Sequence, residues 1–158
     1  MKIASILENQ NIEKRVAITP EIAKKYLSLG FEVSLSENYA SHLGIQDEEY
    51  KELGVSISKN KKDIITNADV IVQLSLLDNE KSSLLKENQT FVGVLNPYDN
   101  EEQINDLVKK KINIFSLELL PRITRAQSMD VLSSQANLAG YKAVVESFAN
   151  FEKAIPMM

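Results

Sequence analysis

The sequence predicts an open, mostly parallel α/β sheet with helices on both faces. Over most of the chain, short apolar runs alternate with polar segments of helical periodicity. Short connections join the first apolar run to a helical segment and that segment to the second apolar run. A strand, a helix and a strand in this order are typical of a right-handed parallel unit. The run at 68–74 is almost continuously apolar, as expected for a strand that is covered on both faces. Loops at the carboxyl ends of such strands are the usual place for a ligand.

About five strands are predicted, with a brief further extension at 55–58; they lie at 2–7, 31–35, 68–74, 90–95 and 112–117. Between the first two strands, Thr19 is the expected N-cap of a helix and Pro20 its first residue. Gly30 stands where a C-cap glycine is expected. The next helix is predicted at 47–53, with Asp47 as its expected cap. Further helices are predicted at 61–67, 82–87 and 100–110. This is the arrangement of Rossmann-like and flavodoxin-like folds.

From Gln127 the pattern changes to one long helix that reaches about Lys153, with Ser128 as its candidate N-cap and Pro156 beyond its end. Gly140 lies in the helix interior, where glycine costs about 1 kcal/mol relative to alanine, so close packing is expected around it. The predicted organisation is an α/β domain at 1–126, a long inter-domain helix at 127–154 that leads to an absent dinucleotide-binding domain, and a truncated linker at 155–158.

Composition and charge exclude several classes of function. The 158 residues carry a net charge of −4 and no cysteine, so neither a nucleic-acid surface nor thiol chemistry is expected. His42 is the only histidine and is assigned a surface or capping role, and no metal site is expected. No apolar run approaches the roughly 18–20 residues of a membrane span, so direct membrane insertion is not expected. The five glycines are far apart and form no Gly-x-Gly-x-x-Gly motif.

Polar side chains crowd the start of the long helix; they are Arg122, Thr124, Arg125, Gln127, Asp130 and Ser133. A helix amino terminus favours polar or anionic ligand groups. Gln127 and Ser133 can each donate and accept, which suits a carboxamide or ribose hydroxyls. Asp130 accepts only and Arg122 donates only. In the alternative interpretation, Asp130 complements the helix dipole, Ser128 caps the helix and the arginines form surface salt bridges, and spacing alone leaves both open.

Two stretches of this sequence resemble a known family. Residues 121–130 read Pro-Arg-Ile-Thr-Arg-Ala-Gln-Ser-Met-Asp, and residues 132–141 read Leu-Ser-Ser-Gln-Ala-Asn-Leu-Ala-Gly-Tyr. Together they resemble the NAD(H)-binding alpha subunit of proton-translocating NAD(P) transhydrogenase. Residues 15–20, Arg-Val-Ala-Ile-Thr-Pro, are similar to that family and to its relatives alanine dehydrogenase and the lysine-forming saccharopine enzymes. The resemblance covers essentially the whole chain, and the longer motif is the specific one.

The resemblance implies a role for each matching residue. Arg122 and Ser133 are implied to hold the nicotinamide carboxamide, and Asp130 matches the family's aspartate in the same loop. Gln127 is implied to bind ribose and to position the ring against NADP(H) on another subunit. Thr124 and Arg125 lie in the same loop and are implied to belong to the cofactor site as well. Because hydride passes directly between two nicotinamides, the reaction needs no acid–base residue.

The resemblance also implies partners and a location. The partners are the NADP(H)-binding and membrane-spanning transhydrogenase components, with a second copy of the subunit as a homodimer. The location is cytoplasmic, peripheral to a bacterial inner membrane through those partners. Since the family's pyrophosphate-binding element lies in a second domain beyond the position of Met158, the chain alone is expected to bind NADH weakly or not at all.

Alanine dehydrogenase is the alternative within the superfamily. Its pattern places a lysine and a histidine at the ends of two strands, and the equivalent positions here are Gln73 and Asn96. Neither side chain can supply a cation or transfer a proton at neutral pH. Arg15 remains, with a salt bridge to Glu8 or Glu13 as its alternative role. This argues against amino-acid dehydrogenation, although many transhydrogenases also keep a lysine near Gln73. A non-catalytic, flavodoxin-like interaction module is the second alternative.

Overall fold

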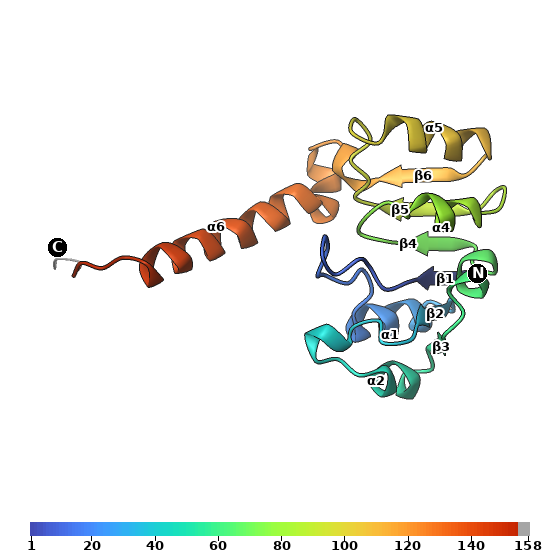
Figure 1. Ribbon diagram of the computed structural model, residues 1–158, viewed down its shortest axis with the longest axis horizontal. Helices are drawn as coiled ribbons and strands as arrows, with labels where there is room; N and C mark the ends of the chain where they lie inside the picture. The colour runs from blue at the N-terminus through green and yellow to red at the C-terminus, as the bar shows by residue number, and fades with distance from the viewer. Residues whose placement is uncertain (155–158) are drawn as a thin grey trace. The chain divides into compact units, whose positions relative to one another are not determined.

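The computed structural model describes residues 1–154, and it divides the chain into two compact units. The first is Met1–Leu117 and the second begins at Glu118. The first unit holds the sheet and the short helices, and the second holds the long helix (Figure 1). The predicted linker at 155–158, including Pro156, lies outside the described residues.

Six strands form one sheet in the order β3-β2-β1-β4-β5-β6 (Figure 1). Every neighbouring pair is parallel, so the predicted parallel sheet with helices is confirmed. The brief extension at 55–58 is a full edge strand, which makes six strands where about five were predicted. Most strands are shorter than the predicted runs, whereas β2 has the predicted length and is shifted by one residue. The strands are β1 (Lys2–Ser5), β2 (Glu32–Ser36), β3 (Ser56–Ser58), β4 (Val70–Val72), β5 (Thr90–Gly93) and β6 (Asn113–Ser116).

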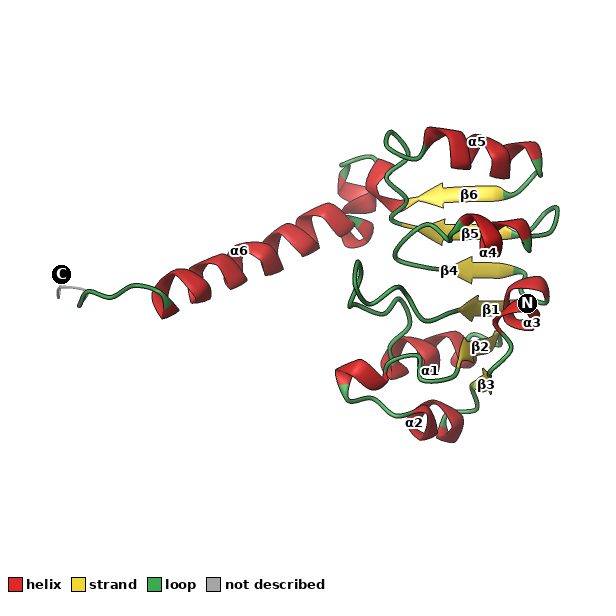
Figure 2. Cartoon of the chain, viewed as in Figure 1, coloured by secondary structure: helices red, strands yellow, loops and turns green. Residues whose placement is uncertain are grey.

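Five helices and one 3-10 turn connect the strands (Figure 2); they are α1 (Pro20–Ser28), η1 (Ser41–Leu43), α2 (Asp47–Glu52), α3 (Lys61–Thr66), α4 (Asn79–Ser83) and α5 (Glu101–Lys109). The start of α1 is as predicted, because Thr19 caps it and Pro20 is its first residue. Gly30 has the positive φ of 83° that a residue closing a helix often adopts.

One predicted helix start and one predicted N-cap are wrong. Helix α4 begins at Asn79 and not at Ser82, because the Asp78 carboxylate accepts the N–H of Lys81 and fixes the start earlier. Helix α2 is capped by Gln46 together with Glu49, and Asp47 is its first residue. The Asp47 carboxylate is buried and accepts the N–H of Asn38, so it supports the preceding loop instead of capping the helix.

Alternation along the strands separates two apolar cores. On one face, Ile64 and Ile65 of α3 belong to the cluster that contains Ala4 of β1. On the other face, Ala23 of α1 belongs to the cluster that contains Ile3. Because neighbouring residues of a strand point to opposite faces, helices cover both faces of the sheet. Phe115 of β6 lies on the same face of the sheet as Ile3 and is 58% exposed. The helices therefore do not cover this face of the sheet at β6.

In the second unit, the predicted single helix is interrupted near its start. The unit contains two 3-10 segments, η2 (Leu117–Leu119, which begins at the last residue of the first unit) and η3 (Thr124–Met129), followed by α6 (Val131–Ala149). Gln127 and Ser128 therefore lie in η3, and Ser128 is not the N-cap. Asp130 leaves the helical conformation, with φ −74° and ψ 91°, and caps α6 by accepting the N–H of Ser133.

The other predictions for the long helix also need correction. Helix α6 ends at Ala149 with Asn150 as its C-cap, before Lys153. An added β-carbon at Gly140 would meet no atom within 4 Å. The close packing predicted around Gly140 is therefore not found among the described residues.

At Gly93, the backbone of β5 passes close to the end of β4. A β-carbon there would lie 2.4 Å from the backbone oxygen of Gln73 and 2.9 Å from a methyl group of Leu95. We expect Gly93→Ala to lower the free energy of unfolding by about 2 kcal/mol, because the sheet must shift to admit the methyl group. Urea denaturation measures the effect, and Gly140→Ala is the matched control. Equal midpoints for Gly93→Ala and the wild type would contradict this prediction.

Candidate functional site

The sheet reverses its winding between β1 and β4. The order runs from β1 outward through β2 to β3 on one side, and from β4 through β5 to β6 on the other. Such a switch point, at the carboxyl ends of the strands, is where ligands of α/β sheets usually bind. A cavity of about 400 Å³ lies at this edge, and Glu8, Gln73, Ser75 and Asn96 are among its lining residues.

The amide of Gln73 fills the centre of the switch point. The side chain is buried, and its Oε1 atom accepts from Ser5 Oγ at 2.7 Å and from the N–H of Ile6 at 2.8 Å. Its Nε2 atom donates to Glu8 Oε1 at 3.1 Å. This use of both ends of the amide explains why glutamine stands here, since a lysine could donate to Glu8 but could not accept from Ser5 or Ile6.

The Glu8 carboxylate joins the end of β1 to the end of β4. Besides Gln73, it accepts from the N–H of Leu74 at 2.6 Å, from the N–H of Ser75 at 3.3 Å and from the Ser75 hydroxyl. Four donors therefore satisfy a carboxylate that is only 9% exposed. A buried carboxylate that is already satisfied in this way has little left to offer a ligand.

Tyr39 extends this network to the other end of the loop at 8–18. Its hydroxyl oxygen accepts from the N–H groups of Ala17 and Ile18 at 3.1 and 3.2 Å, and lies 2.8 Å from Ser5 Oγ. Because Ser5 donates its one proton to Gln73, Tyr39 donates to Ser5. Burial raises the pKa of Tyr39, which keeps the phenol a donor. Tyr39, Ser5, Gln73 and Glu8 thus form one directed chain of hydrogen bonds.

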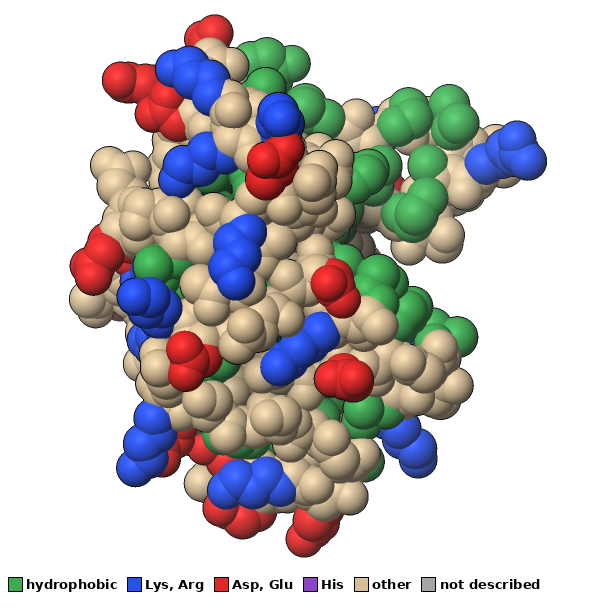
Figure 3. Space-filling view, turned by 90° about the vertical axis from the view of Figure 1, so that its right-hand side faces the viewer, with side chains coloured by type: hydrophobic (Ala, Val, Ile, Leu, Met, Phe, Trp, Pro, Cys, Tyr) green, Lys and Arg blue, Asp and Glu red, His purple; other side chains and the backbone are tan. Residues whose placement is uncertain are grey.

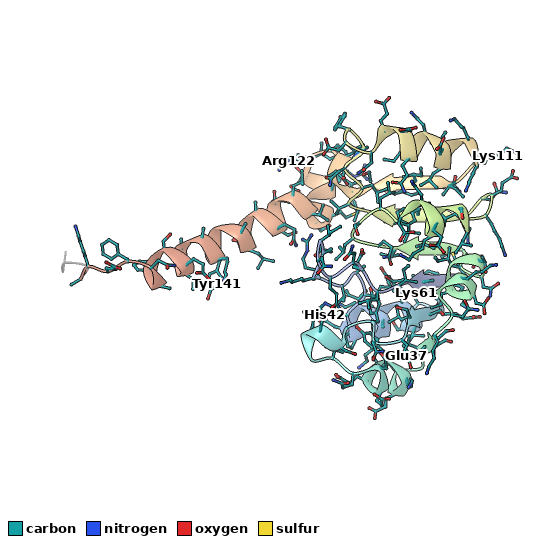
Figure 4. The ribbon with its side chains drawn as sticks, viewed as in Figure 1. Glu37, His42, Lys61, Lys111, Arg122 and Tyr141 are labelled. Carbon is teal, nitrogen blue, oxygen red and sulfur yellow. The ribbon has the colours of Figure 1, made fainter. Side chains whose placement is uncertain are left out.

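Two contacts hold the middle of the same loop. The Arg15 guanidinium binds Glu13 through two hydrogen bonds of 2.9 and 2.6 Å, and this pairing lowers the pKa of the Glu13 carboxyl. Glu13, one of the two partners proposed for Arg15, forms an ion pair with it. His42 lies in η1 (Figure 4). Its Nε2 atom is 2.6 Å from the carbonyl oxygen of Lys14 and donates to it.

In the second unit, three of the six predicted site residues are brought together. Asp130 Oδ1 accepts the N–H of Ser133 at 3.0 Å, and Oδ2 accepts the Ser133 hydroxyl at 2.7 Å. Arg122 Nε lies 3.8 Å from the same Oδ2 atom, and Arg122 stands beside the first turn of α6 (Figure 4). The hydrogen bonds from Ser133, and then the charge of Arg122, hold the pKa of Asp130 below its ordinary value.

The other three predicted residues stand apart from this cluster. Thr124, Arg125 and Gln127 belong to η3, and within residues 1–154 their side chains make no hydrogen bond or ion pair. Only the backbone links Gln127 to the cluster, because its carbonyl oxygen accepts the N–H of Asp130 at 3.3 Å. Its amide is therefore available to a ligand.

The sequence prediction missed part of the switch-point network. Ser5, Tyr39 and Ser75 were not singled out, although Ser5 ends a buried strand and Ser75 follows Gln73 closely. Polar residues placed directly after two neighbouring buried strands were the available signal. The contact of Tyr39 with Ser5 joins residues 34 positions apart, and no pattern in the sequence reports it.

Residues 6–139 match the family described as the N-terminal domain of alanine dehydrogenase/PNT. The chain belongs to this family. Over its whole length it is 43% identical to an NAD(P) transhydrogenase alpha subunit of Rickettsia prowazekii, and it spans 42% of that relative. The predicted resemblance to transhydrogenase alpha subunits is thereby confirmed.

Two solved structures show the same fold. The transhydrogenase from Sinorhizobium meliloti is 39% identical with a TM-score of 0.89, covering 99% of this chain and 47% of that one. An L-alanine dehydrogenase gives a TM-score of 0.70 at 19% identity, covering 75% of this chain and 32% of its own, and this likeness concerns the fold alone. The chain thus spans less than half the length of these relatives.

Neither a metal site nor a membrane-spanning helix is found in the described residues. Among residues 1–154, no three His, Asp or Glu side chains lie close enough to hold a metal ion. None of the helices in that part of the chain is long and apolar enough to cross a membrane. Over the face seen in Figure 3, basic and acidic side chains are interspersed and neither sign forms a continuous patch.

Replacing Gln73 by glutamate tests the directed network. The new carboxylate would face Glu8 and could not donate to it, so the pKa of this pair would be raised in the folded state. A raised carboxyl pKa costs stability at neutral pH and the cost disappears as pH falls below the unfolded value near 4. We expect Gln73→Glu to lose on the order of 3 kcal/mol at pH 7, with the loss shrinking toward pH 4.

The control for this prediction is Gln73→Met, which removes the hydrogen bonds without adding charge. Its loss of unfolding free energy, measured by urea denaturation across the same pH range, should change little with pH. A Gln73→Glu deficit that is the same at both ends of the range would show that Glu8 does not face residue 73 as a carboxylate.

Proposed function

We propose that this chain is the N-terminal part of the alpha subunit of a proton-translocating NAD(P) transhydrogenase. In this role it positions the nicotinamide of NAD(H) for hydride transfer to NADP(H) on a partner component. The observation that carries the proposal is full-length similarity to transhydrogenase alpha subunits in a chain that gathers Arg122, Asp130 and Ser133 at the start of α6.

The donor set of the second unit fits a nicotinamide. Arg122 can donate to the carboxamide oxygen, and Ser133 lies next to it through their common partner Asp130. Gln127, with its amide unengaged, is assigned to a ribose hydroxyl, and Thr124 and Arg125 flank it. NAD(H), when bound, supplies the hydride chemistry, so the residues of this chain only orient the ring and exclude other geometries.

The pyrophosphate is assigned to another domain. The 158 residues contain no Gly-x-Gly-x-x-Gly motif, and they span 42% of the Rickettsia relative. We therefore assign α6 as the connection from an N-terminal α/β domain to a dinucleotide-binding domain. The NADP(H)-binding and membrane-spanning components are the proposed partners. The subunit is proposed to act as a homodimer on the cytoplasmic face of a bacterial inner membrane.

Two other functions are less well supported. An alanine dehydrogenase must bind a 2-oxo acid, but here Glu13 pairs with Arg15, and an amide locked to Glu8 and Ser5 occupies position 73. A free-standing interaction module would need the reading frame to stop after Met158. A following segment with a Gly-x-Gly-x-x-Gly motif would exclude that module.

The isolated chain should bind NADH weakly. Without a pyrophosphate site it can contact only the nicotinamide end, so we expect no saturation below the millimolar range in calorimetric titration. The complete alpha subunit, titrated under the same conditions, is the positive control. Sub-micromolar affinity of the isolated, folded chain would contradict the assignment of the pyrophosphate site to another domain.

Gln127 should act on the geometry of transfer more than on binding. In the complete subunit assembled with its NADP(H) component, we expect Gln127→Asn to slow hydride transfer at least about tenfold, while NADH affinity changes less than about threefold. Stopped-flow transfer and equilibrium titration measure the two quantities. Gln135→Asn makes the same chemical change on α6 and should alter neither. Equal losses of rate and affinity would refute a positioning role.

A further inference from the structure

The two halves of the sheet carry their helices on opposite faces. Strands β1, β2 and β3 follow one another outward on one side, and β4, β5 and β6 on the other (Figure 1). Because crossovers between parallel strands are right-handed, halves that wind in opposite directions place their connecting helices on opposite faces. Tyr50 of α2 accordingly packs on the face of Ile3, and Leu107 of α5 packs on the other face. The helices of the first unit therefore leave the face of Ile3 uncovered over β5 and β6.

An apolar row runs into this uncovered region. The register pairs Val72 with Val92 and Val92 with Phe115, so the three residues form one row across β4, β5 and β6. Val72 packs against the core on the face of Ile3. Val92 and Phe115 belong to neither apolar cluster of the described residues, and Phe115 is 58% exposed. Since parallel sheets are almost always covered on both faces, the row is a part of the core that lacks its outer layer.

The uncovered region has the dimensions of one helix. Two neighbouring strands occupy about 10 Å across a sheet. This width is close to the diameter of a helix with its side chains, about 10–12 Å. On the same face, Thr90 and Asn113 lie opposite each other two positions before Val92 and Phe115. The missing layer is therefore apolar over the carboxyl half of the strands and meets polar residues toward their amino ends.

We propose that one amphipathic helix, from the part of the alpha subunit that this chain does not contain, packs across Val92 and Phe115. The inference rests on the proposed function, since it requires a complete alpha subunit. The chain spans 42% of the Rickettsia relative and 47% of the Sinorhizobium transhydrogenase, so more than half of each relative could supply the helix. A segment of the same subunit has a high effective concentration and needs no second molecule. Its apolar stripe, with residues at i, i+3, i+4 and i+7, would face the row.

Two other occupants would protect the row under different conditions. Helix α6 would protect it already in the isolated chain. A second copy of the subunit would protect it at high concentration and release it on dilution. A helix from the rest of the subunit protects the row only in the complete subunit, and does so at every concentration.

The test uses the absence of cysteine from the 158 residues. Phe115→Cys, or the nearly isosteric Val92→Cys, introduces one thiol into the row. Its alkylation by N-ethylmaleimide is followed by mass spectrometry of the modified peptide, in the isolated chain and in the complete subunit. In the complete subunit we expect alkylation at least about 100-fold slower, because the thiol then reacts only after local opening. The protection should persist on dilution.

Val108→Cys is the matched control, because Val108 is 57% exposed on α5, whose core side lies on the other face of the sheet. Its rates should agree in the two proteins. Equal rates in the two proteins for both Phe115→Cys and Val92→Cys would overturn the proposal. Slow alkylation in the isolated chain, or protection that is lost on dilution, would also overturn it. Since the readout does not involve NAD(H), a subunit that protects the row and does not bind NADH would overturn the proposed function alone.

Discussion

The side chain of Gln73 holds the two halves of the sheet together at their carboxyl ends. Backbone pairing between β1 and β4 is short, with Ile3 opposite Val70 and Ala4 opposite Ile71. Beyond that point the side chains of Gln73 and Glu8 take over, accepting the N–H groups of Ile6, Leu74 and Ser75. An unpaired buried N–H costs free energy comparable to a lost hydrogen bond. The stability of the middle of the sheet therefore depends on these side-chain hydrogen bonds, which replace the backbone pairing.

The same interaction decides where a ligand can bind. At the switch point, Gln73 and Glu8 use their hydrogen-bonding capacity on the fold, and Glu13 occupies the guanidinium of Arg15. In the second unit the opposite holds, because Arg122 is 67% exposed and pairs with Asp130 only at 3.8 Å. Gln73 and Glu8, which line the cavity of about 400 Å³ at the usual ligand position of an α/β sheet, are thus engaged by the fold. In the second unit, the side chains of Thr124, Arg125 and Gln127 make no such contact within residues 1–154.

Prediction from sequence succeeded where local chemistry decides the structure. The apolar runs located five of the six strands and marked the sixth, β3, only as a brief extension, and Thr19-Pro20 located α1, because each signal is contained in a few neighbouring residues. It failed where two local signals compete. Ser128 and Asp130 are equally good caps by residue type, and only the hydrogen bonds of Asp130 to Ser133 decide between them.

The functional residues divide in the same way. The cluster of Arg122, Asp130 and Ser133 lies within one short segment, so the sequence could nominate it. The network of Tyr39, Ser5, Gln73 and Glu8 joins residues more than 30 positions apart, and its hydrogen-bond directions emerge only in three dimensions. Backbone amide shifts during NADH titration of the complete alpha subunit test the account most directly. It predicts perturbed amides at 122–133 and unperturbed amides at Glu8 and 73–75; the reverse pattern would contradict it.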